Sequence, residues 1–269
     1  MTHYVCFGVP YYIGKHHTDR TEVETVERSG IADEIGAEWV NIEPDFAAAP
    51  DPLSAVNRAL AQAIAAHPNC TPLIFASDCC SALGAVKGLS ARHNDLAVLW
   101  FDAHGDFNTE ETTPSGFLGG MPLAWLVGDG DQRYMRGIDL LPIAQADVII
   151  TDARDLDPEE SVRLKESAIT HLKKVDELFA VSLPNKPLYV HFDTDVVDIV
   201  EMPGMGYPAP NGPPLDMCVT ALERVAQDGN VVGLLFSLWN GSLPTDGKSL
   251  AGVLRLARAF VDGKGSART

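Results

Sequence analysis

The sequence is poor in positive charge and contains no long hydrophobic run. Lys and Arg together number 20 against 37 Asp and Glu, which gives a formal net charge of -17. This excess of negative charge argues against nucleic acid or an anionic membrane surface as a partner, whereas a small cationic substrate is compatible with it. The N-terminal stretch MTHYVCFGVPYYIGKHH has no basic segment followed by a long apolar one. We therefore expect a soluble, cytoplasmic protein.

The cysteines do not form the even set that is typical of a disulfide framework. The chain has five, mostly in apolar surroundings, and we expect reduced thiols. The adjacent Cys79 and Cys80 are poorly placed to bridge each other, so the pair needs another explanation.

No low-complexity segment, repeat or Gly/Ser linker divides the chain, and we expect one domain over residues 1–269. Short apolar runs alternate with helical patterns, which is typical of βα units that build a parallel sheet. The predicted fold is α/β, with three layers in which helices flank a mostly parallel central sheet. We expect strands at 3–10, 38–44, 72–77, 96–102, 147–153, 186–193 and 231–239, and helices at 52–67, 158–167, 215–227 and 248–260.

Polar residues with metal-ligand chemistry follow two of the predicted strands. Asp102, His104 and Asp106 follow the apolar run LAVLWF at two-residue spacing. They can converge on one face if the extended conformation persists beyond the strand. A second run, KPLYVHF, leads into Asp193 and Asp195 at the same spacing. Because buried carboxylates must be paired or bound to metal, the two patterns indicate a shared site.

The number of charged ligands indicates more than one ion. Four carboxylates carry too much negative charge for one divalent cation, but they fit a binuclear site with ions ~3.5–4 Å apart. Oxygen-rich ligands with one imidazole favour manganese, although affinity order alone does not select the metal. We expect two manganese ions, with iron or zinc as alternatives.

These motifs resemble those of a known family. FDAHGDFNT and FDTDVVD closely resemble DAHxDxNT and SxDxDxxDP, the metal motifs of the ureohydrolases, which include arginases and agmatinases. The resemblance runs from GVPYY near residue 9 to the last predicted helix. It implies one domain with a parallel sheet, and a binuclear manganese site that activates hydroxide for attack on a guanidinium carbon. Asp106 would accept or relay a proton.

The remaining family ligand is replaced in this sequence. Relatives take a histidine from GGDHS after an earlier strand, whereas this chain has ASDCCSA. Matching Asp78 to the aspartate of that motif puts Cys79 at the histidine position. We expect Cys79 to be a metal ligand with a lowered pKa, because a helix N-terminus and nearby cations favour the thiolate. Cys80 is expected to be a small buried thiol.

Two further differences from the family motifs fall at positions that contact the substrate in relatives. The arginase stretch SGNLHGMP reads SGFLGGMP here, so Gly119 replaces a histidine proposed to transfer protons. In SLWNG, Leu238 replaces a carboxylate that helps hold the guanidinium in relatives. Since the metal carboxylates are retained, we favour a changed substrate over a decayed site. An N-hydroxyguanidine is less basic than a guanidine and can approach the metals as a neutral group.

The other end of the substrate is expected to be an amino acid. In arginases, the residues matching Asn108 and Ser115 hold the α-carboxylate, and an aspartate matching Asp157 holds the α-amine. The alternatives are a turn-forming Asn, a loop Ser and a helix cap, and the cap is compatible with substrate binding. Agmatine, which lacks the carboxylate, is disfavoured.

Together, the departures resemble the branch of this family that hydrolyses Nω-hydroxy-L-arginine to hydroxyurea and L-ornithine in D-cycloserine biosynthesis. His191 stands where relatives have Ser. It is a candidate proton donor to ornithine, a supporting residue behind the ligands, or a satisfied buried histidine. The alternatives are an arginase, agmatinase or formiminoglutamate-type hydrolase, an enzyme with a cysteine nucleophile, and a metal-holding guanidino-compound binding protein without turnover.

Assembly is predicted from the C-terminal segment. Arginases commonly form trimers through C-terminal contacts, but little beyond GKGSART follows the last predicted helix. This leaves little chain for an exchange arm, and we expect a monomer.

Overall fold

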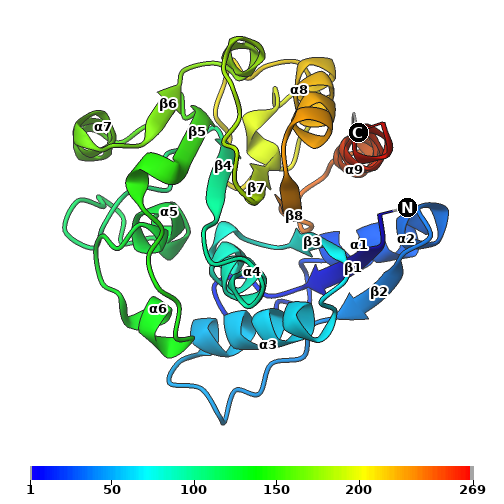
Figure 1. Ribbon diagram of the computed structural model, residues 1–269, viewed down its shortest axis with the longest axis horizontal. Coiled ribbons are helices and arrows are strands. Elements are labelled where there is room, and N and C mark those ends of the chain that lie inside the picture. Colours follow the sequence, from blue (N-terminus) through cyan, green and yellow to red (C-terminus); the bar gives the residue numbers. More distant parts are fainter. Residues whose placement is uncertain (1, 267–269) are drawn as a thin grey trace.

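A single parallel sheet forms the centre of the molecule. In the computed structural model, which describes residues 2–266, eight strands pair in the order β2-β1-β3-β8-β7-β4-β5-β6, and every pairing is parallel (Figure 1). The strands are β1 Tyr4–Val9, β2 Glu38–Asn41, β3 Thr71–Ala76, β4 Ala97–Asp102, β5 Val148–Asp152, β6 Thr170–Leu172, β7 Leu188–Asp193 and β8 Val231–Ser237. The predicted α/β fold class is confirmed.

The central strands are buried on both faces, as parallel strands covered by helices must be. Every residue of β1, β4 and β7 is buried, which explains why their sequences are continuous apolar runs rather than alternating ones. The edge strands β2 and β6 are short and partly exposed. We did not predict β6, because three residues are too few to show a periodicity.

Helices cover both faces of the sheet and bury two separate hydrophobic clusters (Figure 1). Side chains of α1, α8 and α9 fill the cluster on one face, and those of α3 to α7 fill the cluster on the other. The helices are α1 Glu22–Arg28, α2 Ile31–Glu34, α3 Pro52–Ala66, α4 Ala82–Ser90, α5 Pro122–Leu126, α6 Arg133–Gly137, α7 Pro158–Glu166, α8 Leu215–Asp228 and α9 Lys248–Gly265.

Two of the predicted helix starts depend on an acidic residue before a proline. The backbone N–H of Ser54 donates to Asp51 Oδ1 at 2.8 Å at the start of α3. At the start of α7, the N–H of Asp157 donates to Glu160 Oε2 at 3.1 Å, as in a capping box. Both predicted starts are confirmed. The helices α1, α2, α5 and α6 are too short to produce the pattern from which longer helices were predicted.

The strand register aligns the carboxyl ends of the central strands. Phe101 of β4 pairs with Phe192 of β7, so Asp102 and Asp193, which follow them, end at the same level. Asp193 in turn pairs with Ser237 of β8. Although β3 and β4 are consecutive in sequence, β8 and β7 lie between them. The loops after β3 and β4 therefore diverge and leave room for a ligand between them.

The one-domain assignment for residues 1–269 stays a prediction, because Met1 and residues 267–269 lie outside the described part. Within residues 2–266, no helix has both the length and the apolar character needed to cross a membrane.

Candidate metal centre

A cavity of about 490 Å³ opens above the aligned strand ends. Its floor contains Cys79, Asp102, Asp106, Asp193 and Asp195. Loops that follow the strands supply its walls, including parts of the long stretches 110–120 and 198–214. Because the donor-rich floor and the open volume adjoin, a molecule in the cavity would lie directly over the carboxylates.

The carboxylates of Asp102 and Asp106 converge, but not through the extended geometry expected from the sequence. β4 ends at Asp102, and Asp106 lies in a turn with a φ of 48°. The carbonyl of Asp106 accepts hydrogen bonds from the N–H groups of Leu123 at 3.0 Å and Ala124 at 3.2 Å, at the start of α5. The condition stated from the sequence, an extended conformation beyond the strand, is therefore not met, because a turn anchored to α5 directs Asp106 toward the site.

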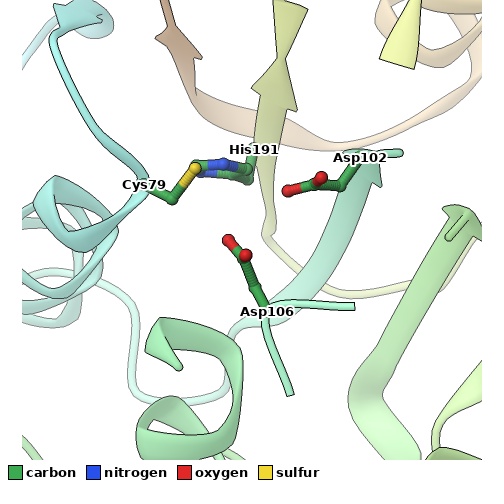
Figure 2. A group of neighbouring side chains, drawn as sticks. All are labelled: Cys79, Asp102, Asp106 and His191. Carbon is green, nitrogen blue, oxygen red and sulfur yellow. The ribbon is translucent and has the colours of Figure 1, made fainter. Parts of the chain in front are cut away.

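Two overlapping groups of side chains have metal-ligand chemistry. Potential ligand atoms of Cys79, Asp102, Asp106 and His191 lie within 4.8 Å of one another, and Figure 2 shows these side chains directed toward a common centre. A second group with the same spacing contains Asp102, His104 and Asp195. Because Asp102 belongs to both groups, the arrangement suits two neighbouring cations that share a carboxylate.

Hydrogen bonds connect the donors further. His104 Nδ1 lies 2.9 Å from Asp195 Oδ2 and 3.5 Å from Asp102 Oδ1. Asp193 accepts from the Cys79 thiol at 2.8 Å and from the N–H of Asp195 at 2.8 Å. The structure thus brings together all the residues that the sequence predicted as ligands: Cys79, Asp102, His104, Asp106, Asp193 and Asp195.

The electrostatics of the cluster fit a cation. Burial, followed by repulsion from Asp195, raises the pKa of Asp193 to about 8. Burial also raises the pKa values of Asp102, Asp106 and Asp195, and neighbouring carboxylates add to each shift. For His104, burial lowers the pKa, but hydrogen bonds and charge from Asp102 and Asp195 outweigh it and raise the pKa to about 12. Concentrated negative charge in a buried site is costly unless cations neutralise it.

Cys79 occupies the first position of the 3₁₀ turn η1, Cys79–Ser81, after β3. Its thiol donates to Asp193 and lies 3.3 Å from Ser237 Oγ. The expected lowering of its pKa is wrong for the protein alone: burial, and then the charges of Asp193, Asp106 and Asp102, raise the pKa well above its usual value. Although η1 continues directly into α4, burial and these carboxylates outweigh the helix N-terminus, so ionisation of Cys79 requires a cation. Cys80 is fully buried, as expected.

His191 lies behind the residues that form the floor of the cavity and is fully buried. Its ring stacks on Trp100 at a centroid distance of 3.6 Å, and its Nδ1 lies 3.5 Å from the Tyr189 hydroxyl. Its Nε2 has no hydrogen-bond partner within residues 2–266, which argues against a satisfied buried histidine. Burial lowers the pKa of His191 well below its usual value, which keeps the ring neutral.

The three predicted substrate-binding residues line the cavity. Asn108 Nδ2 donates to Asp157 Oδ2 at 2.9 Å, and Asn108 Oδ1 accepts from Thr112 Oγ1 at 3.0 Å. Asp157 is also the N-cap residue directly before α7, so the helix-cap alternative is confirmed. Ser115 is exposed at the rim, where its hydroxyl accepts from the N–H of Phe117 at 3.2 Å.

A wall of three aromatic side chains adjoins Gly119. Phe117 lies 4.8 Å from Tyr207 and 6.2 Å from Tyr12 between ring centroids, and we name these three residues the aromatic wall. A Cβ atom at Gly119 would lie only 2.4 Å from the Phe117 ring. Phe117 thus occupies the space next to Gly119 into which a side chain would project. Leu238, directly after β8, adds a further apolar surface to the cavity.

Sequence reasoning missed the aromatic wall and Glu160. Buried Glu160 accepts from the N–H of Phe107 at 2.9 Å and from that of Asp157 at 3.1 Å, which ties the loop after β4 to the start of α7. The capping pattern DPEE contained a signal for Glu160. The sequence contained no signal for the aromatic wall beyond aromatic residues in irregular stretches, because the three residues of the wall are far apart in the sequence.

Comparisons with known proteins agree with this architecture. Residues 13–243 match the model of the arginase family. The arginase of Eremothecium gossypii is 32% identical over 185 residues, which cover 63% of this chain and 46% of that protein. The arginase of Bacillus subtilis is 31% identical over 177 residues, covering 61% of this chain and 60% of that protein. The matched segment thus spans about half of these two relatives.

The fold is shared over a larger part of the chain. The crystal structure of arginase from Bacillus subtilis superposes with a TM-score of 0.86 at 24% identity, covering 97% of this chain and 98% of that one. Formimidoylglutamase from the same species gives a TM-score of 0.77 at 17% identity, covering 100% and 89%. With the family model matching most of the sequence, the chain belongs to the arginase family.

Proposed function

We propose that this protein hydrolyses Nω-hydroxy-L-arginine to hydroxyurea and L-ornithine with the help of two manganese ions. The observation that carries the proposal is a contrast within one cavity. The metal-binding carboxylates are retained and buried, whereas Gly119 and Leu238 stand where arginases have a histidine and a carboxylate. The site therefore suits metal-assisted hydrolysis of a group that needs less countercharge than a guanidinium.

The donors would hold two divalent ions, and Asp102, which belongs to both groups, would be available to each of them. When bound, divalent ions act as Lewis acids that acidify water and polarise the carbon under attack. The proposed ligands are Cys79, Asp102, His104, Asp106, Asp193 and Asp195. A thiolate softens the ligand set, so iron or zinc are alternatives to manganese.

Polar side chains are available for the amino-acid end of the substrate. Asn108 and Ser115 would bind the α-carboxylate, and Asp157 would bind the α-amine, since the three side chains line the same cavity. The hydrogen bond between Asn108 and Asp157 holds both side chains in place before a ligand arrives.

The reacting end would lie between the donors and the apolar surface of Leu238 and Phe117. Burying a permanently charged guanidinium beside Leu238 without a facing carboxylate is unfavourable. A neutral N-hydroxyguanidine avoids this cost, and its hydroxyl adds a polar atom that can contact the donors.

Hydrolysis requires water to add to the central carbon, the bond to the ornithine nitrogen to break, and a proton to reach that nitrogen. Asp106 is suited to accept the proton from water, because its Oδ2 is buried and has no hydrogen-bond partner among the described residues.

Arginine hydrolysis is the second candidate, because the relatives that share about a third of the matched residues are arginases. Agmatinase and formiminoglutamate-type activities are weaker alternatives. A cysteine nucleophile is disfavoured, because burial and the surrounding carboxylates oppose ionisation of Cys79. The remaining alternative is a metal-holding binding protein without turnover.

The test is product analysis of manganese-loaded protein with L-arginine or Nω-hydroxy-L-arginine, with and without chelator. Hydroxyurea and ornithine from the hydroxylated substrate, little urea from arginine and loss with chelator would support the proposal. Equal or greater urea release would identify an arginase. Binding of hydroxyarginine without turnover would identify the binding protein, and activity that resists the chelator would favour the cysteine nucleophile.

The monomeric state, the cytoplasmic location and a role in D-cycloserine biosynthesis are parts of the same proposal. The first is tested by the mass of the protein in solution. The last follows only if hydroxyurea is the product.

A further inference from the structure

We propose that His191 is an additional metal ligand, and that it supplies from strand β7 the imidazole which relatives supply at the position of Cys79. The inference rests on the metal centre of the proposed function, but not on the identity of the substrate. It assigns the ion beside Cys79 a mixed set of sulfur, nitrogen and oxygen donors.

The position of His191 in β7 directs it to the same centre as the other donors. His191 and Asp193 are two residues apart in a strand and therefore share a face. A ring nitrogen of His191 lies within 4.8 Å of ligand atoms of Cys79, Asp102 and Asp106. Figure 2 shows its ring edge next to the Cys79 sulfur, with the two carboxylates opposite.

The hydrogen bonding of His191 leaves one nitrogen free for a ligand. Nε2 is buried without a partner in the described residues, an arrangement that is costly unless something binds there. If Nδ1 carries the proton, it can donate to the Tyr189 hydroxyl 3.5 Å away, and the lone pair is then on Nε2. Asp106 Oδ2, the other unpartnered atom of this group, lies in the same cluster.

Trp100 holds the ring in place. Its indole stacks on the imidazole with an interplanar angle of 12°, and its Nε1 donates to Asp102 Oδ2 at 3.0 Å. One side chain therefore orients two members of the group. Groups behind a metal commonly orient its ligands in this manner.

The accessibility of His191 favours ligation over proton donation. His191 is fully buried and does not line the cavity, whereas Cys79, Asp102 and Asp106 do. A donor to the departing amine must reach substrate, so the sequence-based hypothesis of His191 as the acid is less compatible with this position.

The ligand chemistry makes the two metal positions unequal. A thiolate and an imidazole suit cobalt, zinc or iron better than manganese, whereas His104 with carboxylates suits manganese. Loss of His191 should therefore weaken one of two binding events and leave the other nearly unchanged.

The experiment is a cobalt(II) and manganese(II) titration of the metal-free full chain. His191→Phe keeps a flat ring for stacking on Trp100 but removes the nitrogens, and His191→Ser introduces the residue of relatives. His171→Phe is the matched control, because it removes a strand histidine whose Nε2 contacts the Asp152 carbonyl at 3.0 Å, outside both donor groups. The readouts are metal stoichiometry, the two affinities, thiolate-to-cobalt charge transfer, and nitrogen couplings in pulsed EPR of the manganese form.

We expect His191→Phe to weaken one site by about tenfold or more, to alter the charge-transfer band and to remove one class of nitrogen coupling. His171→Phe should change none of these. Unchanged affinities and couplings in both His191 variants, with native thermal unfolding, would overturn the inference and leave the proposed substrate standing. If instead the couplings disappear while arginine is the better substrate, the inference stands and the proposed function fails. A wild-type chain that binds neither metal would overturn both.

Discussion

The floor and the roof of the cavity are built in different ways. The floor consists of buried side chains at the aligned ends of β4 and β7, fixed by the sheet register and by hydrogen bonds to one another. The roof is formed by the aromatic wall of Tyr12, Phe117 and Tyr207. These three side chains come from loops and are half-buried or exposed. Because the roof can change without disturbing the sheet, a family member can keep its metal chemistry while it changes its substrate.

The largest effect should follow from a change in the floor. Asp102→Asn removes the carboxylate that belongs to both donor groups. We expect loss of metal at both positions and a fall in turnover of at least about 10²–10³-fold, the scale for removing one electrostatic stabiliser. Metal analysis and single-turnover assays measure this. Asp155→Asn, at an exposed carboxylate 4.0 Å from His104 Nε2, is the matched control. Equal effects of the two variants would show that a carboxylate in the floor is no more important for metal binding than an exposed one at the rim of the cavity.

The buried titratable groups of the floor should also make the stability of the metal-free protein depend on pH. The raised pKa values of Asp193, about 8, and His104, about 12, mean that the folded state holds protons more tightly than the unfolded state. Their stabilisation is complete below the unfolded pKa values of about 4 and about 6.5 and is lost as pH rises toward the folded values. We expect metal-free protein to lose several kcal/mol of stability between about pH 5 and pH 9, at about 1.4 kcal/mol per pKa unit.

Thermal and denaturant unfolding with and without manganese would measure this slope. Bound cations favour the ionised carboxylates, so the loaded protein should lose much less stability over the same range. A metal-free protein whose stability rises with pH would contradict the electrostatic description of the floor.

A change in the roof should lower the free energy of unfolding more than it changes the rate of the catalysed reaction. Gly119→His forces a side chain into the space of the Phe117 ring, at a cost of about 1–3 kcal/mol for overpacking. The double variant Phe117→Asn with Gly119→His should recover most of that stability, because it opens the space. Unfolding free energies of both single variants and the double variant give the coupling. Additive effects would mean that the two positions are independent.

The smallest expected effect concerns substrate preference. Leu238→Glu returns a carboxylate to the wall of the cavity and should raise the rate ratio of arginine to hydroxyarginine by about tenfold, or roughly 1.4 kcal/mol. Competition assays with both substrates measure this ratio, and Leu238→Gln controls for size and polarity. An equal shift in the glutamine variant would show that charge does not select the substrate.

The floor was more predictable from the sequence than the roof. Asp102 and Asp193 follow short, continuous apolar runs, and such runs identify buried strands whose ends meet at one edge of a sheet. The route of Asp106 into the site was not predictable, because it depends on a turn anchored to α5. Nor was the high pKa of Cys79, which results from carboxylates distant in sequence.

The roof lacked a comparable pattern. Phe117 and Tyr207 are separated by the three strands β5, β6 and β7 and by several helices, and only the folded chain brings their rings to 4.8 Å. That Gly119 leaves space for the Phe117 ring could likewise be recognised only from the distance between the two residues in the fold.

The stacking of Trp100 has an optical consequence. Its indole touches the His191 ring on one face and holds Asp102 through its N–H, so its emission is sensitive to what occupies the donor cluster. A paramagnetic ion bound there would quench this tryptophan more strongly than one bound elsewhere on the surface. If the donor cluster binds metal as proposed, Trp100 would serve as a fluorescent reporter of its occupancy, without substrate and without an added dye.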